Sequence, residues 1–182
     1  MGSNNDISLK ALAKINLGLD VVRRREDGYH EVRMIMQTIH LYDRLDIKRT
    51  KEPGIQIQTN LSFLPVNENN LIYKAAKLLM DEFSITDGVS VKLDKRIPVA
   101  AGMAGGSTDA AAMLIGVNRL FSLGLTKRQL MERGVQIGAD VPYCIMRGTA
   151  LAEGIGEALS PLPPMVKCPV LIAKPSISAS TK

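Results

Sequence analysis

The amino-acid sequence predicts an α+β domain, and two observations support that prediction. Alternating apolar and polar residues, the pattern of β-strands, dominate the first third of the chain, whereas helical periodicity dominates the middle. Strands followed by helices are typical of α+β folds rather than of regularly alternating α/β folds. With 182 residues, the chain has the length of one domain that buries a substantial core.

The first strand is predicted at the N-terminal end. Every odd position from 7 to 21 is apolar, which is the period-two pattern of a strand with one face on a core. This alternation puts Lys14 and Asn16 together on the opposite face.

A turn and further strands follow. The Asp-Gly pair at positions 27 and 28 suits a tight turn, so the arginines at 23–25 are read as a solvated hairpin tip. A second alternating run begins at His30. Further short strands are expected near residues 44–48, 55–59 and 89–94.

Three helices are predicted in the middle of the chain. The first begins at the N-cap Asn70 and carries apolar residues at helical spacing. The second opens around residues 107–109, capped by their hydroxyl and carboxylate side chains, and runs to about Phe121. The third begins at Thr126, which forms a capping box with Gln129, and ends near Gly138. The apolar runs 141–146 and 170–173 are read as buried strands.

The composition excludes several classes of protein. The chain is 46% hydrophobic and 23% charged, the ordinary globular mixture. It has no run of about 18 apolar residues for a membrane span and no signal peptide at its N-terminus, so a cytoplasmic protein is expected. Cys144 and Cys168 lie in apolar runs, without metal-ligand spacing, and are read as two reduced core thiols.

The net charge of +5 lies entirely in the second half of the chain. Residues 92–182 carry 11 basic and 6 acidic side chains, whereas residues 1–91 carry 12 of each. Such an excess suits either nucleic acid or a small anionic ligand. The basic residues are scattered, Trp is absent and aromatic residues make up 4% of the chain. The sequence therefore favours a small anionic ligand, with no nucleic-acid partner and no membrane partner.

The most informative segment runs from Pro98 to Ala112, with three glycines before a predicted helix. Glycines let backbone amides approach a polyanion closely, and a helix N-terminus adds unsatisfied donors and a partial positive charge. No lysine follows Gly106 as in the Walker A motif, and the glycine spacing does not fit the dinucleotide fingerprint. The small residues of the following helix are read as too small to form a core. This segment predicts a phosphate-binding loop.

The same segment, Pro-Val-Ala-Ala-Gly-Met-Ala-Gly-Gly-Ser-Thr-Asp-Ala-Ala-Ala, resembles the phosphate-binding motif of the GHMP kinases, which include galactokinase and homoserine and mevalonate kinases. Residues 13–17, 27–31 and 138–142 resemble the branch of this family that acts on 4-diphosphocytidyl-2-C-methyl-D-erythritol. These matches run in order along almost the whole chain. Met103 and Thr108 stand where the family usually has Leu and Ser.

The resemblance implies a fold and an activity. The fold would be the N-terminal domain of a GHMP kinase, which is similar to a ribosomal-protein fold. The activity would be ATP-dependent phosphorylation of the 2-hydroxyl of that cytidyl substrate in non-mevalonate isoprenoid biosynthesis, with ATP and Mg²⁺ required.

The resemblance also assigns site residues by position. Asp140 corresponds to the catalytic base and Lys14 to its lysine partner. Asn16, Tyr29 and His30 correspond to the residues that bind the cytidine diphosphate substrate. Mg²⁺ would be held by Ser107 and Thr108. The ATP-binding residues would be Asn70, Lys95, Pro98, Val99, Ala100, Ala101, Gly102, Met103, Ala104, Gly105, Gly106, Ser107 and Thr108.

Domain boundaries and alternatives complete the prediction. Residues 1–7 are expected to be disordered or tag-derived, residues 8–170 to form the N-terminal domain, and residues 171–182 to begin a truncated second domain. A non-catalytic nucleotide- or metabolite-binding module, or another small-molecule GHMP kinase, is the alternative function. The sequence does not indicate an oligomeric state.

Overall fold

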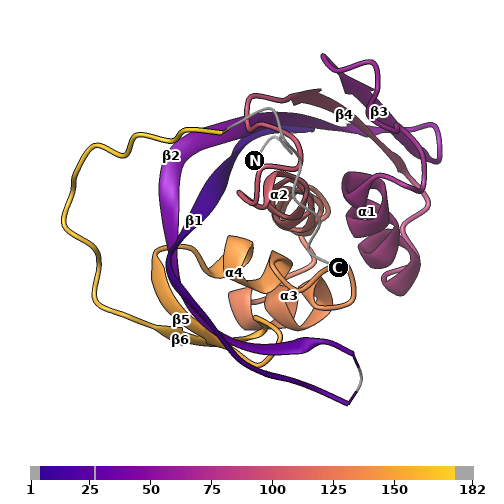
Figure 1. Ribbon diagram of the computed structural model, residues 1–182. Coiled ribbons are helices and arrows are strands. Elements are labelled where there is room, and N and C mark those ends of the chain that lie inside the picture. The colour runs from indigo at the N-terminus through magenta and orange to yellow at the C-terminus, as the bar shows by residue number, and fades with distance from the viewer. Residues whose placement is uncertain (1–4, 27, 175–182) are drawn as a thin grey trace.

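A curved six-stranded sheet forms one layer of the molecule, and the helices lie on its concave face (Figure 1). This computed structural model describes residues 5–26 and 28–174. The opposite face of the sheet is left to solvent. The predicted α+β class is confirmed, because strands and helices occupy separate layers around one core.

A long hairpin forms the spine of the sheet. Strands β1 (Asp6–Arg24) and β2 (His30–Thr50) pair antiparallel over nearly their whole length. β1 begins at Asp6, so ordered structure starts before the predicted boundary at Ser8. The tip of the hairpin is exposed, as expected for its arginines.

Strict alternation along β1 breaks at an irregularity. The pairing register shifts between Leu12 and Lys14, and both Ala13 and Lys14 are buried. The prediction that Lys14 lies on the face away from the core is therefore wrong. The shift in pairing register next to Lys14 turns its side chain inward.

The remaining strands flank β2 on the side away from β1. Strand β4 (Gly88–Asp94) pairs antiparallel with residues 44–50 of β2, and β3 (Ile55–Thr59) pairs parallel with β4. Strand β5 (Thr149–Glu153) pairs antiparallel with residues 34–37 of β2, and β6 (Ala158–Pro161) pairs with β5. The middle of β2, residues 39–43, therefore has no strand on this side within the described chain.

Two of the predicted helix starts are confirmed. Helix α1 (Leu71–Glu82) begins after Asn70, whose side chain accepts a hydrogen bond from the Ile72 amide. Helix α3 (Lys127–Gly134) opens on the predicted capping box, although it ends four residues earlier than expected. The second predicted helix, α2 (Gly105–Leu120), starts earlier than expected and has Ala104 at its N-cap, without a side-chain hydrogen bond. The predicted capping by hydroxyls and a carboxylate is wrong.

Two apolar runs do not form the predicted strands. Residues Val141–Met146 form the short helix α4, because Pro142 has a dihedral angle suited to a first helical turn and lacks the donor that a central strand needs. Residues 170–173 have no regular structure, and Leu171 is 97% exposed. Residues 1–4 and 175–182 lie outside the described chain, so the predicted terminal segments are described only in part.

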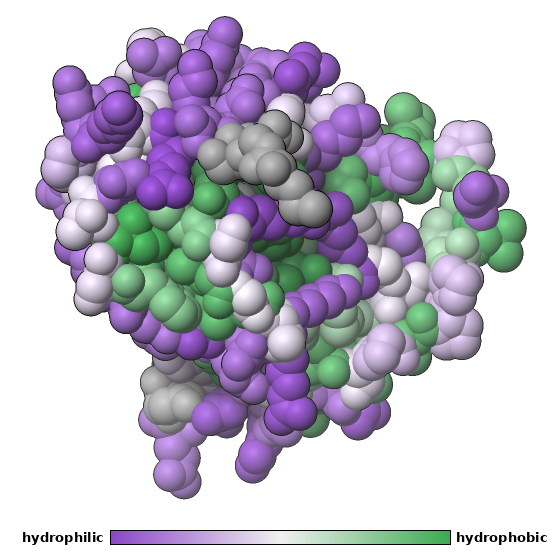
Figure 2. Space-filling model, turned by 180° about the vertical axis from the view of Figure 1, so that it is seen from behind, coloured by the Kyte–Doolittle hydropathy of each residue, from purple (hydrophilic) through white to green (hydrophobic). Residues whose placement is uncertain are grey.

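The chain beyond β6 stands away from the body of the molecule, and Figure 2 shows a gap beneath it. Together with residues 37–41 of β2 it lines a hollow of about 580 Å³. Cys168 lies in this segment and is exposed, which corrects its assignment to the core, whereas Cys144 is buried as predicted.

The core lies between the sheet and α2. Ala110, Ala111 and Ala112 are at most 1% exposed, so the interpretation of these residues as too small for a core is wrong. Small side chains are needed here because the helix approaches the sheet closely: a Cβ atom on Gly116 would lie 2.3 Å from Ile47 Cδ1. No helix in the described residues is long and apolar enough to cross a membrane.

The Asn70 side chain leads to a first prediction. Its Oδ1 accepts from the Ile72 amide at 2.9 Å and its Nδ2 donates to the Pro65 carbonyl at 2.7 Å. We expect Asn70→Ala to lower the free energy of unfolding by about 1–2 kcal/mol, measured by urea denaturation. The matched control, Asn69→Ala, changes an exposed side chain and should leave stability within about 0.5 kcal/mol; equal effects of both would contradict the capping role.

Candidate active site

The two predicted catalytic residues come together, although they are far apart in sequence. Lys14 reaches the site from β1, at the point where the pairing with β2 shifts register, and Asp140 lies at the N-cap of α4. Lys14 Nζ lies 3.9 Å from Asp140 Oδ2, and the two side chains are 7% and 33% exposed. The pair therefore combines a nearly buried cation with a carboxylate that solvent or a ligand can reach.

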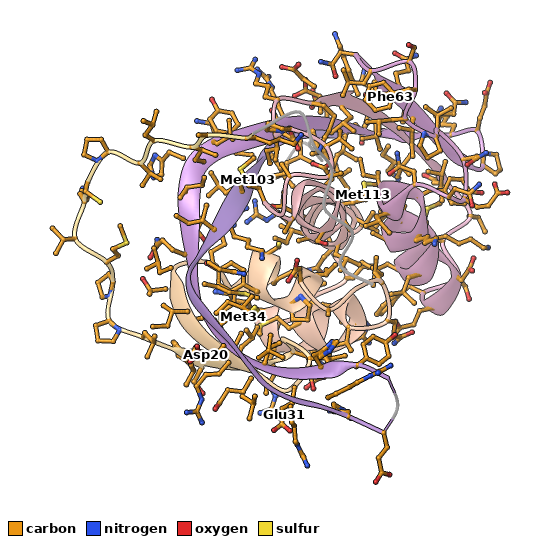
Figure 3. All side chains as sticks on the ribbon, viewed as in Figure 1. Asp20, Glu31, Met34, Phe63, Met103 and Met113 are labelled. Atoms are coloured by element: carbon orange, nitrogen blue, oxygen red, sulfur yellow. The ribbon has the colours of Figure 1, made fainter. Side chains whose placement is uncertain are left out.

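Asn16 and the glycine-rich loop hold Lys14 in place. The Lys14 ammonium donates a hydrogen bond to Asn16 Oδ1 at 3.1 Å, and Asn16 Nδ2 in turn lies 3.5 Å from the sulfur of Met34. The Lys14 backbone amide donates to the Met103 carbonyl at 3.2 Å. Met103, labelled in Figure 3, therefore joins β1 to the loop directly before α2.

The loop presents backbone donors at the start of α2. Ala100, Gly102 and Ala104 have φ values of 54°, 71° and 55°, a left-handed conformation that turns successive amides toward one side. The amides of residues 105–107 donate no hydrogen bond within the described chain. No acidic residue lies in the first turn of α2. These free donors and the helix dipole make an anion-binding end.

The two hydroxyls of the loop differ in what they can bind. Thr108 is 2% exposed, and its Oγ1 donates to the Leu12 carbonyl at 2.8 Å. This bond fixes α2 to β1 and leaves Thr108 poorly placed for a metal ion. Ser107 is only partly buried and keeps its hydroxyl available. The described residues contain no group of three or more His, Cys, Asp or Glu side chains that would hold a metal ion.

Lys95 lies beneath the loop rather than at an open surface. It is 8% exposed, and its ammonium is hydrogen bonded to Asp43 and, at 2.9 Å, to Asp109 Oδ2. The structure thus buries this predicted ATP-binding residue among carboxylates. We call Asp43, Lys95 and Asp109 the buried charge cluster.

Neither acid of the buried charge cluster was predicted to pair with Lys95: Asp43 had no predicted role, and Asp109 was expected only to cap the second helix. Asp43 is fully buried and Asp109 is 3% exposed. Burial raises the pKa of Asp109 to about 8, against the opposing attraction of Lys95. The Asp109 Oδ1 atom has no hydrogen-bond partner within the described chain. A sequence signal did exist, since Asp43 interrupts an apolar run in β2 and Asp109 precedes three alanines that pack into the core.

Other predicted site residues lie farther away. Tyr29 is 62% exposed and, like His30, lies near the hairpin tip. Arg24 pairs with His30 and Asn16 with Met36, so the tip lies roughly 25 Å along β1 from Asn16. Asp20 and Glu31 mark this arm of the hairpin in Figure 3, well separated from Met103. The structure therefore joins Asn16 to the Lys14–Asp140 pair but does not bring Tyr29 and His30 to it.

Asn70 and the loop are neighbours through α1. The Leu71 side chain lies 3.3 Å from the position that a Cβ atom on Gly106 would take. The polar atoms of Asn70 are occupied by its own capping bonds. Pro98, Val99 and Ala100 lie on the exposed side of the loop, and Ala101 is partly buried.

Comparison with known proteins finds one family of kinases with a similar fold. Residues 70–148 match the family model described as the GHMP kinases N terminal domain. Solved structures of homoserine kinase from Cytophaga hutchinsonii and mevalonate kinase from Methanococcus jannaschii share the fold, with TM-scores of 0.69 and 0.67 at 16% identity. They cover 90% and 89% of this chain, which covers 53% and 57% of theirs. The chain therefore shares its fold with these kinases, and residues 70–148 match the GHMP kinases N terminal domain.

Relatives that share one enzyme name match almost the whole chain. The chain is 63% identical over 97% of its length to 4-diphosphocytidyl-2-C-methyl-D-erythritol kinases of Lachnoclostridium phytofermentans and Lachnospira eligens. A crystal structure of 4-(cytidine 5'-diphospho)-2C-methyl-D-erythritol kinase matches 86% of the chain at 38% identity, with a TM-score of 0.75 and 55% of that structure covered. The chain spans about 60% of the length of the curated relatives.

The raised pKa of Asp109 predicts a dependence of stability on pH. Between the ordinary carboxyl pKa of 3.8 and about 8, folded Asp109 keeps a proton that the unfolded chain releases. This contribution to stability is therefore complete below about pH 4 and is lost as the pH rises toward 8, with a slope on the order of 1 kcal/mol per pH unit.

We expect Asp109→Asn, which has no proton to lose, to remove this slope from urea unfolding measured between about pH 5 and pH 8. The control is Asp20→Asn, which changes an exposed carboxylate and should keep the wild-type slope. Parallel pH profiles for the wild type and Asp109→Asn would contradict the assignment.

Proposed function

We propose that the chain acts in the ATP-dependent phosphorylation of the 2-hydroxyl of 4-diphosphocytidyl-2-C-methyl-D-erythritol, in the cytoplasm, as a step of non-mevalonate isoprenoid biosynthesis. The observation that carries this proposal is the Lys14–Asp140 pair beside the uncapped start of α2. The 63% identity to relatives of that name supports the choice of substrate.

The proposed chemistry assigns Asp140 as the base. Its carboxylate is one-third exposed, so it can accept the proton of a substrate hydroxyl placed within hydrogen-bond reach. That oxygen then attacks the γ-phosphorus of ATP. Lys14 lies beside Asp140. Its ammonium would stabilise the negative charge that develops on the attacking oxygen and on the transferred phosphoryl group. Positioning and electrostatics supply most of the catalysis in such reactions.

The glycine-rich loop would bind the phosphates of ATP. The free amides of residues 105–107 and the dipole of the 16-residue helix α2 supply donors and partial positive charge. Of the two loop hydroxyls, Ser107 suits Mg²⁺ together with phosphate oxygens, whereas Thr108 is occupied by Leu12. When bound, Mg²⁺ would neutralise charge on the β- and γ-phosphates.

The residues proposed to bind the cytidyl substrate are the three assigned by the family resemblance. Asn16, hydrogen bonded to Lys14, would contact the end of the substrate near the reacting hydroxyl. Tyr29 and His30 would contact the cytidine end, since an exposed aromatic ring can stack on a base. The partners are small molecules, with no nucleic acid involved.

A second function is a nucleotide-binding module without turnover. The observation that favours it is that the chain spans about 60% of the length of the curated relatives. An assay of the 182-residue chain with ATP, Mg²⁺ and the cytidyl substrate separates the two functions. Product formation supports the kinase, and nucleotide binding without product supports the module.

The base role of Asp140 is tested by Asp140→Asn. The amide keeps the shape of the side chain but cannot accept the hydroxyl proton, so turnover should fall by about 10²–10⁴-fold while ATP affinity changes little. Turnover is measured by ADP release and affinity by calorimetry. Asp81→Asn, at an exposed position of α1, is the control, and full activity of Asp140→Asn would remove Asp140 from this role.

The phosphate-loop role is tested by Gly105→Val. A Cβ atom on Gly105 would lie 3.0 Å from Lys95 Nζ and 3.2 Å from Ile97 Cγ2, so the larger side chain displaces the loop from its support. We expect ATP affinity to fall at least about tenfold, or about 1.4 kcal/mol. Gly18→Ala, at a position with open space around the added Cβ, is the control. Unchanged ATP affinity of Gly105→Val would count against the loop as the phosphate site.

A further inference from the structure

The buried charge cluster joins three separate elements at one point beneath the loop. Asp43 comes from the part of β2 that pairs with β1 but has no strand on its other edge within the described residues, Lys95 follows β4, and Asp109 lies in the second turn of α2. The Lys95 ammonium bridges both carboxylates. Besides Lys95 and Asp43, Cys144 of α4 is a titratable group close to Asp109. Burial raises the pKa of the Cys144 thiol to about 12, so it stays neutral.

The segment that leads into the loop is fixed at both its backbone and its side chain. Asp43 Oδ1 accepts the amides of Arg96 and Ile97 at 2.5 and 2.8 Å. Asn60 brackets the backbone of Lys95, accepting from its amide at 2.8 Å and donating to its carbonyl at 3.1 Å. The backbone of residues 95–97 is therefore held on the sheet immediately before the loop begins.

The Lys95 ammonium also supports the far end of the loop. It lies 3.0 Å from the position of a Cβ atom on Gly105, the first residue of α2 and one of those with free amides. Asp109 ties the next turn of the same helix to the same ammonium. The Lys95 side chain therefore contacts the groups that hold both ends of the loop, which lie ten residues apart in sequence at Lys95 and Gly105.

We propose that Lys95 is a positioning residue of the glycine-rich loop: through Asp43 and Asp109 it holds residues 104–107 where their amides meet phosphate, without touching the nucleotide. This inference rests on the proposed function for its ligand. It replaces the expectation that Lys95 binds ATP directly, because a side chain that is 4% exposed, with its ammonium shared by two acidic side chains, has no open path to the nucleotide.

The first test needs no nucleotide. Lys95→Met keeps the length of the side chain but removes the ammonium, and hydrogen exchange of the free 182-residue chain is compared with that of the wild type. We expect the hydrogen-bonded amides at the two ends of the loop, those of Arg96, Ile97 and Thr108, to exchange at least about tenfold faster, while α1 and β3 keep their rates. Lys92→Met, at an exposed lysine of β4 three residues before Lys95, is the matched control and should leave the loop unchanged.

Loss of the cation also leaves Asp43 and Asp109 buried without the ammonium that both contact, which destabilises the whole fold. The double variant Lys95→Met/Asp109→Asn replaces one of the two acids by an amide that stays neutral beside Asp43 and should recover much of the lost stability in urea unfolding. If the loop amides still exchange rapidly in the double variant, Lys95 positions the loop. If loop exchange returns to the wild-type rate together with stability, its role is only structural and the proposal is overturned.

Nucleotide affinity then separates positioning from direct contact. Positioning of a phosphate site predicts that the double variant loses at least about tenfold in ATP affinity but much less in AMP affinity, because fewer phosphates use the loop. Equal losses for ATP and AMP would show contact with the nucleoside and overturn the proposal. A wild-type chain that binds no ATP, yet shows the loop response in hydrogen exchange, would remove the proposed function and leave the positioning role standing.

Discussion

The close approach of α2 to the sheet is the constraint on which the rest of the structure depends. With Gly116 over Ile47, and alanines at 110–112, the helix lies nearer the strands than larger side chains would allow. Its N-terminus is thereby fixed beside β1, where Thr108 bonds to the Leu12 carbonyl. The loop can reach that point only through left-handed residues, which is why its amides are turned outward rather than used in capping.

Two lysines, Lys14 and Lys95, are buried near the start of α2, where their charges need partners. The two side chains differ in how far the protein supplies those partners. Lys95 is shared by two carboxylates, so its charge is compensated within the protein. Among the described residues, the Lys14 ammonium has Asn16 as its hydrogen-bond partner at 3.1 Å and one carboxylate at 3.9 Å. An ammonium has three donors, so Lys14 retains capacity for an anionic ligand. The lysine with fewer internal partners is therefore the one suited to chemistry, and the fully paired one is suited to support.

Much of this could be read from the sequence, because local patterns with a physical cause were strong. The cap at Asn70 and the capping box at Thr126 follow from side-chain hydrogen bonds to nearby amides, and both are present. The resemblance of residues 13–17 and 138–142 to one family indicated that Lys14 and Asp140 belong to one site. The structure brings the two side chains within 3.9 Å of each other. Motifs of this kind are local, so they survive without knowledge of the fold.

The errors occurred where tertiary structure decides. Residues 141–146 are apolar on every side, and periodicity does not distinguish a buried strand from a buried helical turn; only Pro142 pointed to the helix. Residues 170–173 have the composition of a buried strand, but nothing within the described chain covers them. The pairing within the buried charge cluster could not be predicted because its acids are 52 and 14 residues from Lys95. The local pattern marks each acid as unusual but does not show which distant charge it meets.

The outer half of β1 shows how one pattern can have two causes. Its odd positions continue the apolar alternation that predicts a buried face, yet Leu17, Leu19 and Val21 are 46–59% exposed. These residues lie between Asn16, beside the Lys14–Asp140 pair, and the hairpin tip that carries Tyr29 and His30. A single ligand that touches both ends has to lie along this arm of the hairpin, since the two groups are roughly 25 Å apart along the strand. The apolar face formed by Leu17, Leu19 and Val21 would then be covered by such a ligand or by a further part of a protein. The period-two pattern of β1 therefore predicts an apolar face correctly, although the helices of this domain do not bury it.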